Sequence, residues 1–323
     1  MARRWLIGST VIALGGLLSL AAAEGSLCLA KRWSLVRGAT PAPTAYDPEI
    51  GWILVGPHRQ AHVSSDFDVT VRIDRHGRRV PAVQGSPQSA AAIVFLGDST
   101  TFGWGVEAEE AFPELVGAAL GQRVANLAVP GYGVDQSVAL FERQGLAERP
   151  SRVVLTLSEN DLSETSAAVS YGRTKMHSSA VATGLAVSPA RDRDWGWAER
   201  SSLWTALRAR WGSWSADLQP SREQQLELVV AWVDRARLAC RSRGAELVVI
   251  DWDVISEQVA ERWSAERLAF VRVSPLLRDL QASGVRPVFA DDPHWVAETH
   301  RVIAREIIAL LRPTRGAGGA LLF

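Results

Sequence analysis

The stretch Ile93-Val94-Phe95-Leu96-Gly97-Asp98-Ser99-Thr100-Thr101-Phe102-Gly103 decides the fold of this chain. Its four leading apolar residues, bounded by glycine, predict a short buried strand. In open α/β sheets the chemistry lies beyond the carboxyl ends of the strands, where Ser99 would stand. Ser99 is therefore a candidate nucleophile. The alternative is that Ser99 or Thr100 only caps the helix that follows.

Strand and helix patterns alternate from this stretch to the end of the chain. We expect strands at 92–96, 123–127, 153–157, 246–251 and 288–289, and helices near 109–121, 135–146, 222–243, 256–269, 275–282 and 296–311. Repeated strand–helix units predict a mostly parallel sheet covered by helices on both faces. The fold class is therefore α/β, a three-layer α/β/α sandwich.

Composition excludes several function classes. The 323 residues are 47% hydrophobic, and 35 basic residues balance 35 acidic ones, so the chain lacks the basic surface of a nucleic-acid-binding protein. It has two cysteines and neither a CxxC pair nor an HExxH helix, which argues against a structural zinc site. We expect no metal and no cofactor, and no nucleic acid among the partners.

The first 37 residues predict a signal-anchor region. Arg3-Arg4 precedes residues 5–23, which carry no charge. Such a stretch is either a retained membrane helix or a cleaved signal peptide. We favour the membrane helix, since Leu27 and Leu29 continue the apolar character. The expected location is the inner membrane, with one span and a periplasmic catalytic domain; cleavage would instead give a secreted protein.

The remaining chain divides into three further parts. Residues 38–90 predict a linker and a small β hairpin, because apolar residues alternate over 66–73 and His76-Gly77 supplies a turn. Residues 91–313 hold the α/β domain, and residues 314–323 form a C-terminal tail.

A segment at about 162–220 interrupts the alternation and reads as an insertion over the crevice side of the sheet. It contains five tryptophans: Trp195, Trp197, Trp204, Trp211 and Trp214. We expect a helix that packs on the domain. A lid, a glycan platform and a membrane-facing surface are the alternatives.

Three more polar segments follow predicted strands: Asn126–Gly133, Ser158–Asp161 and Asp291–Trp295. Each has an ordinary structural explanation, such as a turn at Gly131, a helix cap at Asn160 or a structural histidine. Together with the candidate serine they supply a nucleophile, a loop amide, a side-chain amide and a base beside a carboxylate. Acyl transfer requires these parts.

With these blocks in this order, the chain resembles the SGNH (GDSL) hydrolase family over roughly residues 90–312. The matching blocks are Gly97-Asp98-Ser99, Asn126 through Gly133, Asn160-Asp161, and Asp291 or Asp292 with His294. The segment Asp47–Trp52 is similar to the lead-in of membrane-anchored bacterial esterases of this family. One departure is Ser158, which stands where glycine is usual and could narrow the pocket.

The resemblance implies a role for each site residue. Ser99 would attack an ester carbonyl, and His294 would take its proton. The oxyanion hole would consist of the backbone amides of Ser99 and Gly131 and the side chain of Asn160. A carboxylate just before the histidine would hold its ring.

Two adjacent aspartates compete for that last role. In the resembled family the carboxylate most often lies three residues before the histidine, which selects Asp291; some envelope-polysaccharide members place it two before, which selects Asp292. An extended segment would let Asp292 and His294 share a face. The Asp-Asp-Pro sequence favours a turn, which would bring Asp291 beneath the ring. We therefore prefer Asp291, with Asp292 as the alternative.

The sequence thus predicts a serine esterase, a carboxylic ester hydrolase that acts outside the cytoplasm. The expected reaction removes or transfers O-acetyl groups on a cell-envelope polysaccharide. The expected partners are an acylated carbohydrate or small ester and, through the N-terminal helix, the membrane. The alternatives are a lipase or thioesterase acting on acyl chains, and a catalytically silent glycan-binding or assembly module.

Overall fold

The computed structural model describes residues 15–16, 18–29, 42–83, 92–171, 173–181, 184–190, 203 and 220–312. The chain forms two compact units. The smaller comprises residues 1–39 and 192–219, and the larger comprises residues 40–191 and 220–323.

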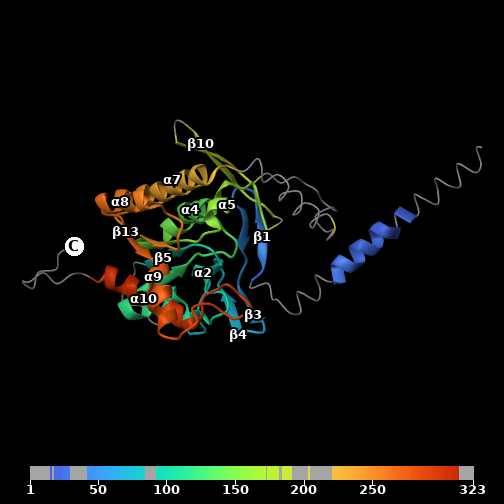
Figure 1. Cartoon of the computed structure of the whole chain (residues 1–323), viewed down its shortest axis with the longest axis horizontal. Helices are drawn as coiled ribbons and strands as arrows, with labels where there is room; N and C mark the ends of the chain where they lie inside the picture. The colour runs from blue at the N-terminus through green and yellow to red at the C-terminus, as the bar shows by residue number, and fades with distance from the viewer. Residues whose placement is uncertain are drawn as a thin grey trace, which may run out of the picture. The chain divides into compact units, whose positions relative to one another are not determined.

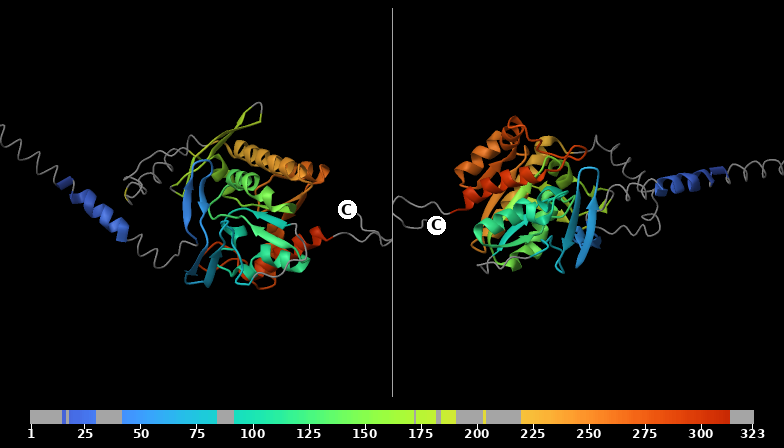
Figure 2. Two further views of the ribbon diagram at one scale, coloured as in Figure 1. Left: turned by 180° about the vertical axis from the view of Figure 1, so that it is seen from behind. Right: turned by 90° about the horizontal axis from the view of Figure 1, so that it is seen from below.

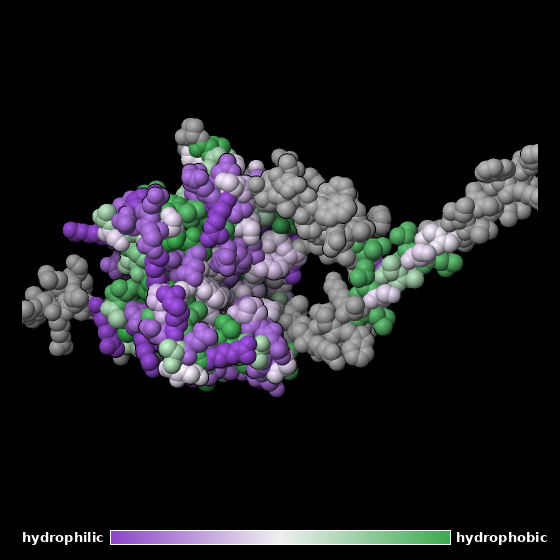
Figure 3. All heavy atoms as spheres, in the orientation of Figure 1, coloured by the Kyte–Doolittle hydropathy of each residue, from purple (hydrophilic) through white to green (hydrophobic). Residues whose placement is uncertain are grey.

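In the smaller unit, residues 18–29 are helical and carry exposed leucines, visible in Figure 3 as hydrophobic side chains. The backbone N–H of Leu203 donates a hydrogen bond to the Glu24 carboxylate at 2.8 Å. Among the residues described, none of the helices has both the length and the apolar character that a membrane crossing requires. Residues 5–14 and 17 of the expected anchor lie outside the described part, so the anchor and the location stay predictions.

The larger unit begins with two antiparallel hairpins, β1 (Thr44–Asp47) with β2 (Gly51–Leu54) and β3 (His58–Val63) with β4 (Asp68–Ile73). A parallel sheet follows in the order β13-β12-β7-β5-β6 (Figure 1). Its strands are β5 (Ala92–Leu96), β6 (Arg123–Asn126), β7 (Pro150–Leu157), β12 (Glu246–Asp251) and β13 (Ala269–Arg272). The connecting helices are α2 (Ser99–Phe102), α3 (Phe112–Leu120), α4 (Val134–Arg143), α5 (Asp161–Ser166), α7 (Arg222–Arg241), α8 (Glu257–Ala265), α9 (Val273–Ala282) and α10 (Ala297–Leu311), with short 3-10 turns η1 (Ala108–Glu110) and η2 (Gly145–Glu148).

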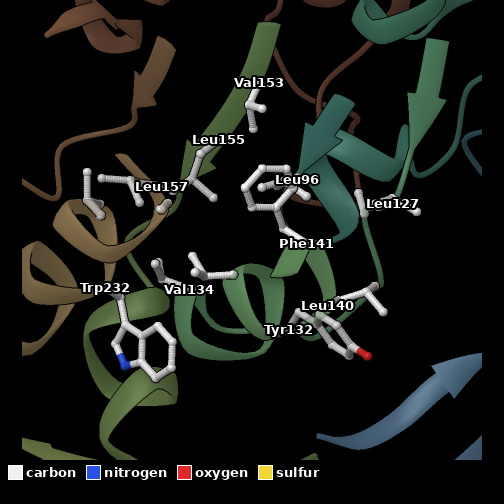
Figure 4. Close-up of a cluster of buried hydrophobic side chains, with 14 of the residues drawn as sticks. Leu96, Leu127, Tyr132, Val134, Leu140, Phe141, Val153, Leu155, Leu157 and Trp232 are labelled. Atoms are coloured by element: carbon white, nitrogen blue, oxygen red, sulfur yellow. The ribbon is translucent and has the colours of Figure 1, made fainter. Parts of the chain in front are cut away.

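Both faces of the sheet are buried, which explains why β5 is apolar throughout. Val94 and Leu96 belong to a core that includes residues of α4 and α7, shown in Figure 4. Ile93 and Phe95 belong to a second core that includes residues of α3 and α10. The two sets alternate because successive side chains of a strand point to opposite faces. Figure 2 shows the helices on the two sides of the sheet, so the expected three-layer α/β/α arrangement is confirmed.

The register of the sheet places the polar segments at one edge. Phe95 pairs with Asn126 on β6 and with Val154 on β7, and all three strands run in the same direction. The loops after β5, β6 and β7 therefore leave the sheet on the same side, as Ser99, Gly131 and Asn160 require if they are to act together.

One expectation about strands is wrong, and another is met only in part. The fifth strand of the sheet is β13, which begins at the last residue of the expected helix 256–269. Val288, expected in the fifth strand, forms only an isolated bridge with Trp295. The expected hairpin is formed only in part: beyond the turn at His76-Gly77, Arg79 makes an isolated antiparallel bridge with Ile73, while β4 pairs along its whole length with the preceding strand β3. Within residues 42–83, the described part of this region, the strands form the hairpins β1–β2 and β3–β4.

The described part of the 162–220 segment consists of α5 and two small hairpins, β8 (Val169–Ser170) with β9 (Arg173–Thr174) and β10 (His177–Val181) with β11 (Gly184–Ser188). Lys175 ties it to α4, since its Nζ lies 2.7 Å from Asp135 Oδ2 and both side chains are fully buried. The five tryptophans, and with them the expected helix, lie outside the described residues.

Candidate active site

The turn after β5 presents Ser99 at the start of α2. Gly97 has φ +149°, and a Cβ there would lie 2.5 Å from Thr101 Oγ1, so only glycine fits. The carboxylate of Asp98 caps the helix by accepting the Thr100 N–H at 2.8 Å. Since Asp98 performs the capping, the Ser99 hydroxyl is left for another partner. This answers the alternative raised by the sequence, that Ser99 is a helix cap.

The partner is His294, which the loop before α10 brings to the same edge. Its Nε2 lies 2.7 Å from Ser99 Oγ, and its Nδ1 lies 2.5 Å from Asp292 Oδ1. In a neutral imidazole one ring nitrogen donates and the other accepts. The carboxylate selects the tautomer with hydrogen on Nδ1, which leaves Nε2 to accept the serine proton. The serine, histidine and aspartate thus form one hydrogen-bonded chain.

The preference for Asp291 is wrong in this structure. The Asp292 carboxylate accepts both the backbone N–H of His294, at 2.9 Å, and its ring Nδ1. Asp291 faces away, because its N–H donates to Asp66 Oδ2 at 2.8 Å and its own carboxylate accepts the Ser65 hydroxyl at 3.2 Å. The β3–β4 turn therefore holds Asp291 and leaves Asp292 to the histidine.

Electrostatics keep Asp292 ionised. Burial by itself would raise the pKa of this carboxyl, but the hydrogen bonds from the backbone and ring of His294, the charge interaction with that ring, and a hydrogen bond from Trp104 outweigh it. The net effect is a pKa below the ordinary value. An ionised carboxylate beside Nδ1 is what stabilises an imidazolium on the opposite side of the ring.

Two backbone N–H groups near the serine remain available. Among the described residues, neither Ser99 nor Gly131 has an acceptor for its amide. Gly131 has φ +80°, and a Cβ there would lie 2.8 Å from a ring carbon of Tyr171, so both conformation and space require glycine. Unpaired amides next to a nucleophile can stabilise a developing oxyanion.

Asn160, the third expected donor, directly precedes α5 but does not cap it, since its side chain makes no capping hydrogen bond. Its amide instead interacts with Glu164 and Tyr171. Glu164 is 8% exposed, and its Oε2 has no hydrogen-bond partner in the described part of the chain. Burial raises the pKa of Glu164 to about 7, against the lowering effect of the hydrogen bonds with Tyr171 and Asn160.

The raised pKa of Glu164 predicts a pH-dependent loss of stability. In the unfolded chain this carboxyl loses its proton near its ordinary value of 4.5, whereas the folded protein retains the proton to about pH 7. Rising pH therefore favours the unfolded state across that window. Glu164→Gln removes the titration, so its free energy of unfolding relative to wild type should rise by up to ~3 kcal/mol between pH 4 and pH 8.

Urea unfolding across this pH range measures the effect. Glu159→Gln is the matched control, since Glu159 is exposed one residue before Asn160. Glu159→Gln changes an exposed side chain, so its free energy of unfolding should stay close to that of wild type. A Glu164→Gln curve that runs parallel to that of wild type would show that the carboxyl titrates normally.

Sequence reasoning missed two residues of the site, Trp104 and Glu164. The Trp104 indole stacks on the His294 ring with centroids 4.9 Å apart and planes 18° from parallel. The only sequence cue for Trp104 is its position in a glycine-flanked turn five residues after Ser99. For Glu164 the cue is the four-residue spacing from Asn160, which places the two side chains on one helical face.

A cavity of about 620 Å³ lies elsewhere, lined by residues of the first hairpin, the turn after β4 and α4, including Leu54, Arg78, Leu140 and Arg143. Ser99, Asp292 and His294 are not among its lining residues. The described residues also contain no group of three or more histidine, cysteine, aspartate or glutamate side chains arranged to hold a metal ion.

The sequence matches one family model, and the fold is similar to several solved structures. The model of the GDSL-like Lipase/Acylhydrolase family matches residues 95–271. Similar solved structures include a G-D-S-L family protein from Desulfitobacterium hafniense, with 14% identity, a TM-score of 0.44, and coverage of 68% of this chain and 99% of that one. A catalytic mutant of an acetylxylan esterase from Geobacillus stearothermophilus has 15% identity and a TM-score of 0.41, covering 70% and 95%. No curated protein matches the sequence.

Proposed function

This chain belongs to the GDSL-like lipase/acylhydrolase family and is a serine ester hydrolase, and from this premise we propose that it removes or transfers O-acetyl groups on a cell-envelope polysaccharide. The observation that carries the chemistry of this proposal is the hydrogen-bonded chain from Ser99 Oγ through His294 to Asp292, with distances of 2.7 and 2.5 Å. A hydroxyl, an oriented imidazole and a carboxylate in this order form an activated nucleophile.

The first half of the proposed reaction forms an acyl-enzyme. Ser99 Oγ attacks the acyl carbonyl carbon while its proton passes to Nε2 of His294. The ionised Asp292 stabilises the imidazolium that results. The amides of Ser99 and Gly131 and the side chain of Asn160 donate to the carbonyl oxygen as it becomes negative. The imidazolium then returns the proton to the sugar oxygen, which leaves as an alcohol.

The second half repeats these steps with another nucleophile. His294 takes a proton from water, or from the hydroxyl of an acceptor sugar, and the oxygen attacks the acyl carbonyl carbon. The tetrahedral intermediate collapses by breaking the bond to Ser99 Oγ, which recovers its proton from His294. Water gives acetate and free enzyme, whereas a sugar hydroxyl gives a transferred acetyl group.

Two features near the donors support a short acyl group and a sugar. Ser158 stands where glycine is usual in the family, and it is buried beside Asn160. Tyr171 lies against Gly131 with 68% of its surface exposed. In this proposal Ser158 would reduce the space available to an acyl chain, and the exposed ring of Tyr171 would offer an apolar face with a polar tip to a carbohydrate.

Chain-length preference tests the substrate proposal. We expect kcat/KM for p-nitrophenyl acetate to exceed that for p-nitrophenyl octanoate by at least ~10-fold, because each surplus methylene that the pocket cannot hold costs transition-state binding. Acetate should also be released from an acetylated envelope glycan. A preference for octanoate would instead support a lipase or thioesterase. A wild-type protein that neither hydrolyses esters nor reacts with a fluorophosphonate would support a silent binding module.

A further inference from the structure

The β3–β4 hairpin contacts the loop that carries His294. The rings of Phe67 and Phe289 pack with centroids 5.2 Å apart. In the same turn, Ser65 and Asp66 hydrogen-bond to Asp291 at 3.2 and 2.8 Å. This hairpin precedes residues 95–271, the part of the chain that the family model matches. The hairpin therefore lies outside the matched residues but contacts the loop that carries His294.

Trp104 contacts both residues that act on Ser99. Its indole stacks on the His294 ring at 4.9 Å, and its Nε1–H donates to Asp292 Oδ2 at 3.1 Å. The other carboxylate oxygen of Asp292, Oδ1, accepts the hydrogen bond from His294, so the two oxygens have separate donors. One side chain thus restricts both the plane of the imidazole and the rotation of the carboxylate.

The backbone of Trp104 is itself fixed to the nucleophile turn. Its N–H donates to the carbonyl oxygen of Ser99 at 3.0 Å. The buried guanidinium of Arg79 donates to the carbonyl of Phe102 at 2.7 Å and also to the carbonyl of Gly103. Trp104 therefore contacts Ser99 through its backbone and His294 through its ring, which fixes the distance between the nucleophile and the base.

His62, on β3, supports the indole from another side. Its ring lies edge-on to Trp104 with centroids 4.6 Å apart and planes at 89°, and it is 1% exposed. Burial, with the nearby Arg79 charge, lowers the pKa of His62 to about 4. At neutral pH it is an uncharged aromatic ring that adds packing but no positive charge beside His294.

We infer that Trp104 is a positioning residue for the His294–Asp292 pair and that the β3–β4 hairpin holds it in place through His62. This inference rests on the proposed function, because it assigns Trp104 a role only if that pair acts on Ser99. A stacked indole face attracts an imidazolium, and its N–H satisfies the carboxylate that faces the imidazolium. Both contacts favour the charged pair that forms during the reaction.

Variants of Trp104 test the inference through kcat and KM for p-nitrophenyl acetate. Trp104→Ala should lower kcat by ~10²-fold with little change in KM, since a misplacement of about 1 Å can cost that much. Trp104→Phe keeps a ring for stacking but loses the N–H, so we expect a smaller loss of about tenfold, typical of one hydrogen bond to a charged group. Trp263→Ala is the control for the loss of an indole: this tryptophan is fully buried on α8, whereas Trp104 is half-buried, so its loss should lower the melting temperature more but leave kcat unchanged.

Variants of His62 test the hairpin. His62→Ala should lower kcat, because the indole loses its edge contact. His62→Phe should restore most of the rate, because an uncharged aromatic ring suffices. A purely structural role would instead link the rate to thermal stability, with His62→Phe and Trp263→Ala losing kcat in proportion to melting temperature.

The outcomes separate this inference from the proposed function. If wild type hydrolyses acetate esters and Trp104→Phe and His62→Ala keep kcat within twofold, Trp104 is not a positioning residue. That result holds even if Trp104→Ala does not fold. If wild type is inactive and is not labelled by a fluorophosphonate, the proposed function fails and the inference fails with it.

Discussion

Ser99→Ala is expected to abolish ester hydrolysis. The hydroxyl is the only group removed, and its hydrogen bond is to His294 Nε2. Loss of the nucleophile of a serine hydrolase lowers kcat by ~10⁶-fold, which leaves only the effect of binding and of the oxyanion donors. The rate with p-nitrophenyl acetate and covalent labelling by a fluorophosphonate should disappear together, while the melting temperature stays close to that of wild type.

Ser242→Ala is a suitable control for this change. Ser242 is exposed at the end of α7, where its hydroxyl donates to the Ala239 carbonyl at 2.7 Å. The same chemical change there should leave turnover and labelling intact. If Ser99→Ala retained its activity, the hydrogen-bonded chain would have no catalytic role and another nucleophile would have to be found.

The sequence predicts a strand most reliably where an unbroken run of apolar residues reflects burial on both faces of the sheet. β5 is apolar at every position because both of its faces are covered, and the same holds for most of β7 and β12. Such strands differ clearly from the amphipathic helices between them. The sequence pattern does not reveal β13, because its four residues follow α8 after only a short turn and no glycine or proline marks the break. Val288-Phe289 looked like a strand but only bridges to Trp295.

Of the residues in the site, only those in the loops that follow the parallel strands can be predicted from the sequence. Ser99, Gly131 and Asn160 each come directly after one of three adjacent parallel strands, so topology alone brings them to one edge. Trp104 and His62 are different, because their importance depends on contacts between a hairpin and two loops that are far apart in sequence. No local pattern encodes such contacts.

The competition between the two aspartates was decided in the same way. The turn propensity of Asp-Asp-Pro is a local preference, and it favoured Asp291. The structure instead holds Asp291 through Ser65 and Asp66, more than 220 residues earlier in the chain. Tertiary hydrogen bonds outweighed the local preference, and Asp292 became the partner of the ring.

Asp292→Asn should therefore be the damaging substitution of the pair. An asparagine can present its NH2 group to Nδ1, which would then have to accept. The hydrogen would move to Nε2, and the imidazole could no longer take the proton of Ser99. The corresponding change in a serine protease lowers kcat by ~10⁴-fold while geometry is kept, and we expect a loss of that order here.

Asp291→Asn is the matched control, with the same chemical change one residue earlier. Its backbone N–H still reaches Asp66, and an amide oxygen can still accept from Ser65, so the tether is retained. Its kcat should stay within about threefold of wild type, as expected for an exposed substitution outside the catalytic chain. Steady-state kinetics and melting temperatures of the two variants decide the matter. A large loss in Asp291→Asn with an active Asp292→Asn would mean that the first aspartate pairs with His294 in solution, since a change confined to the β3–β4 contact cannot remove a general base.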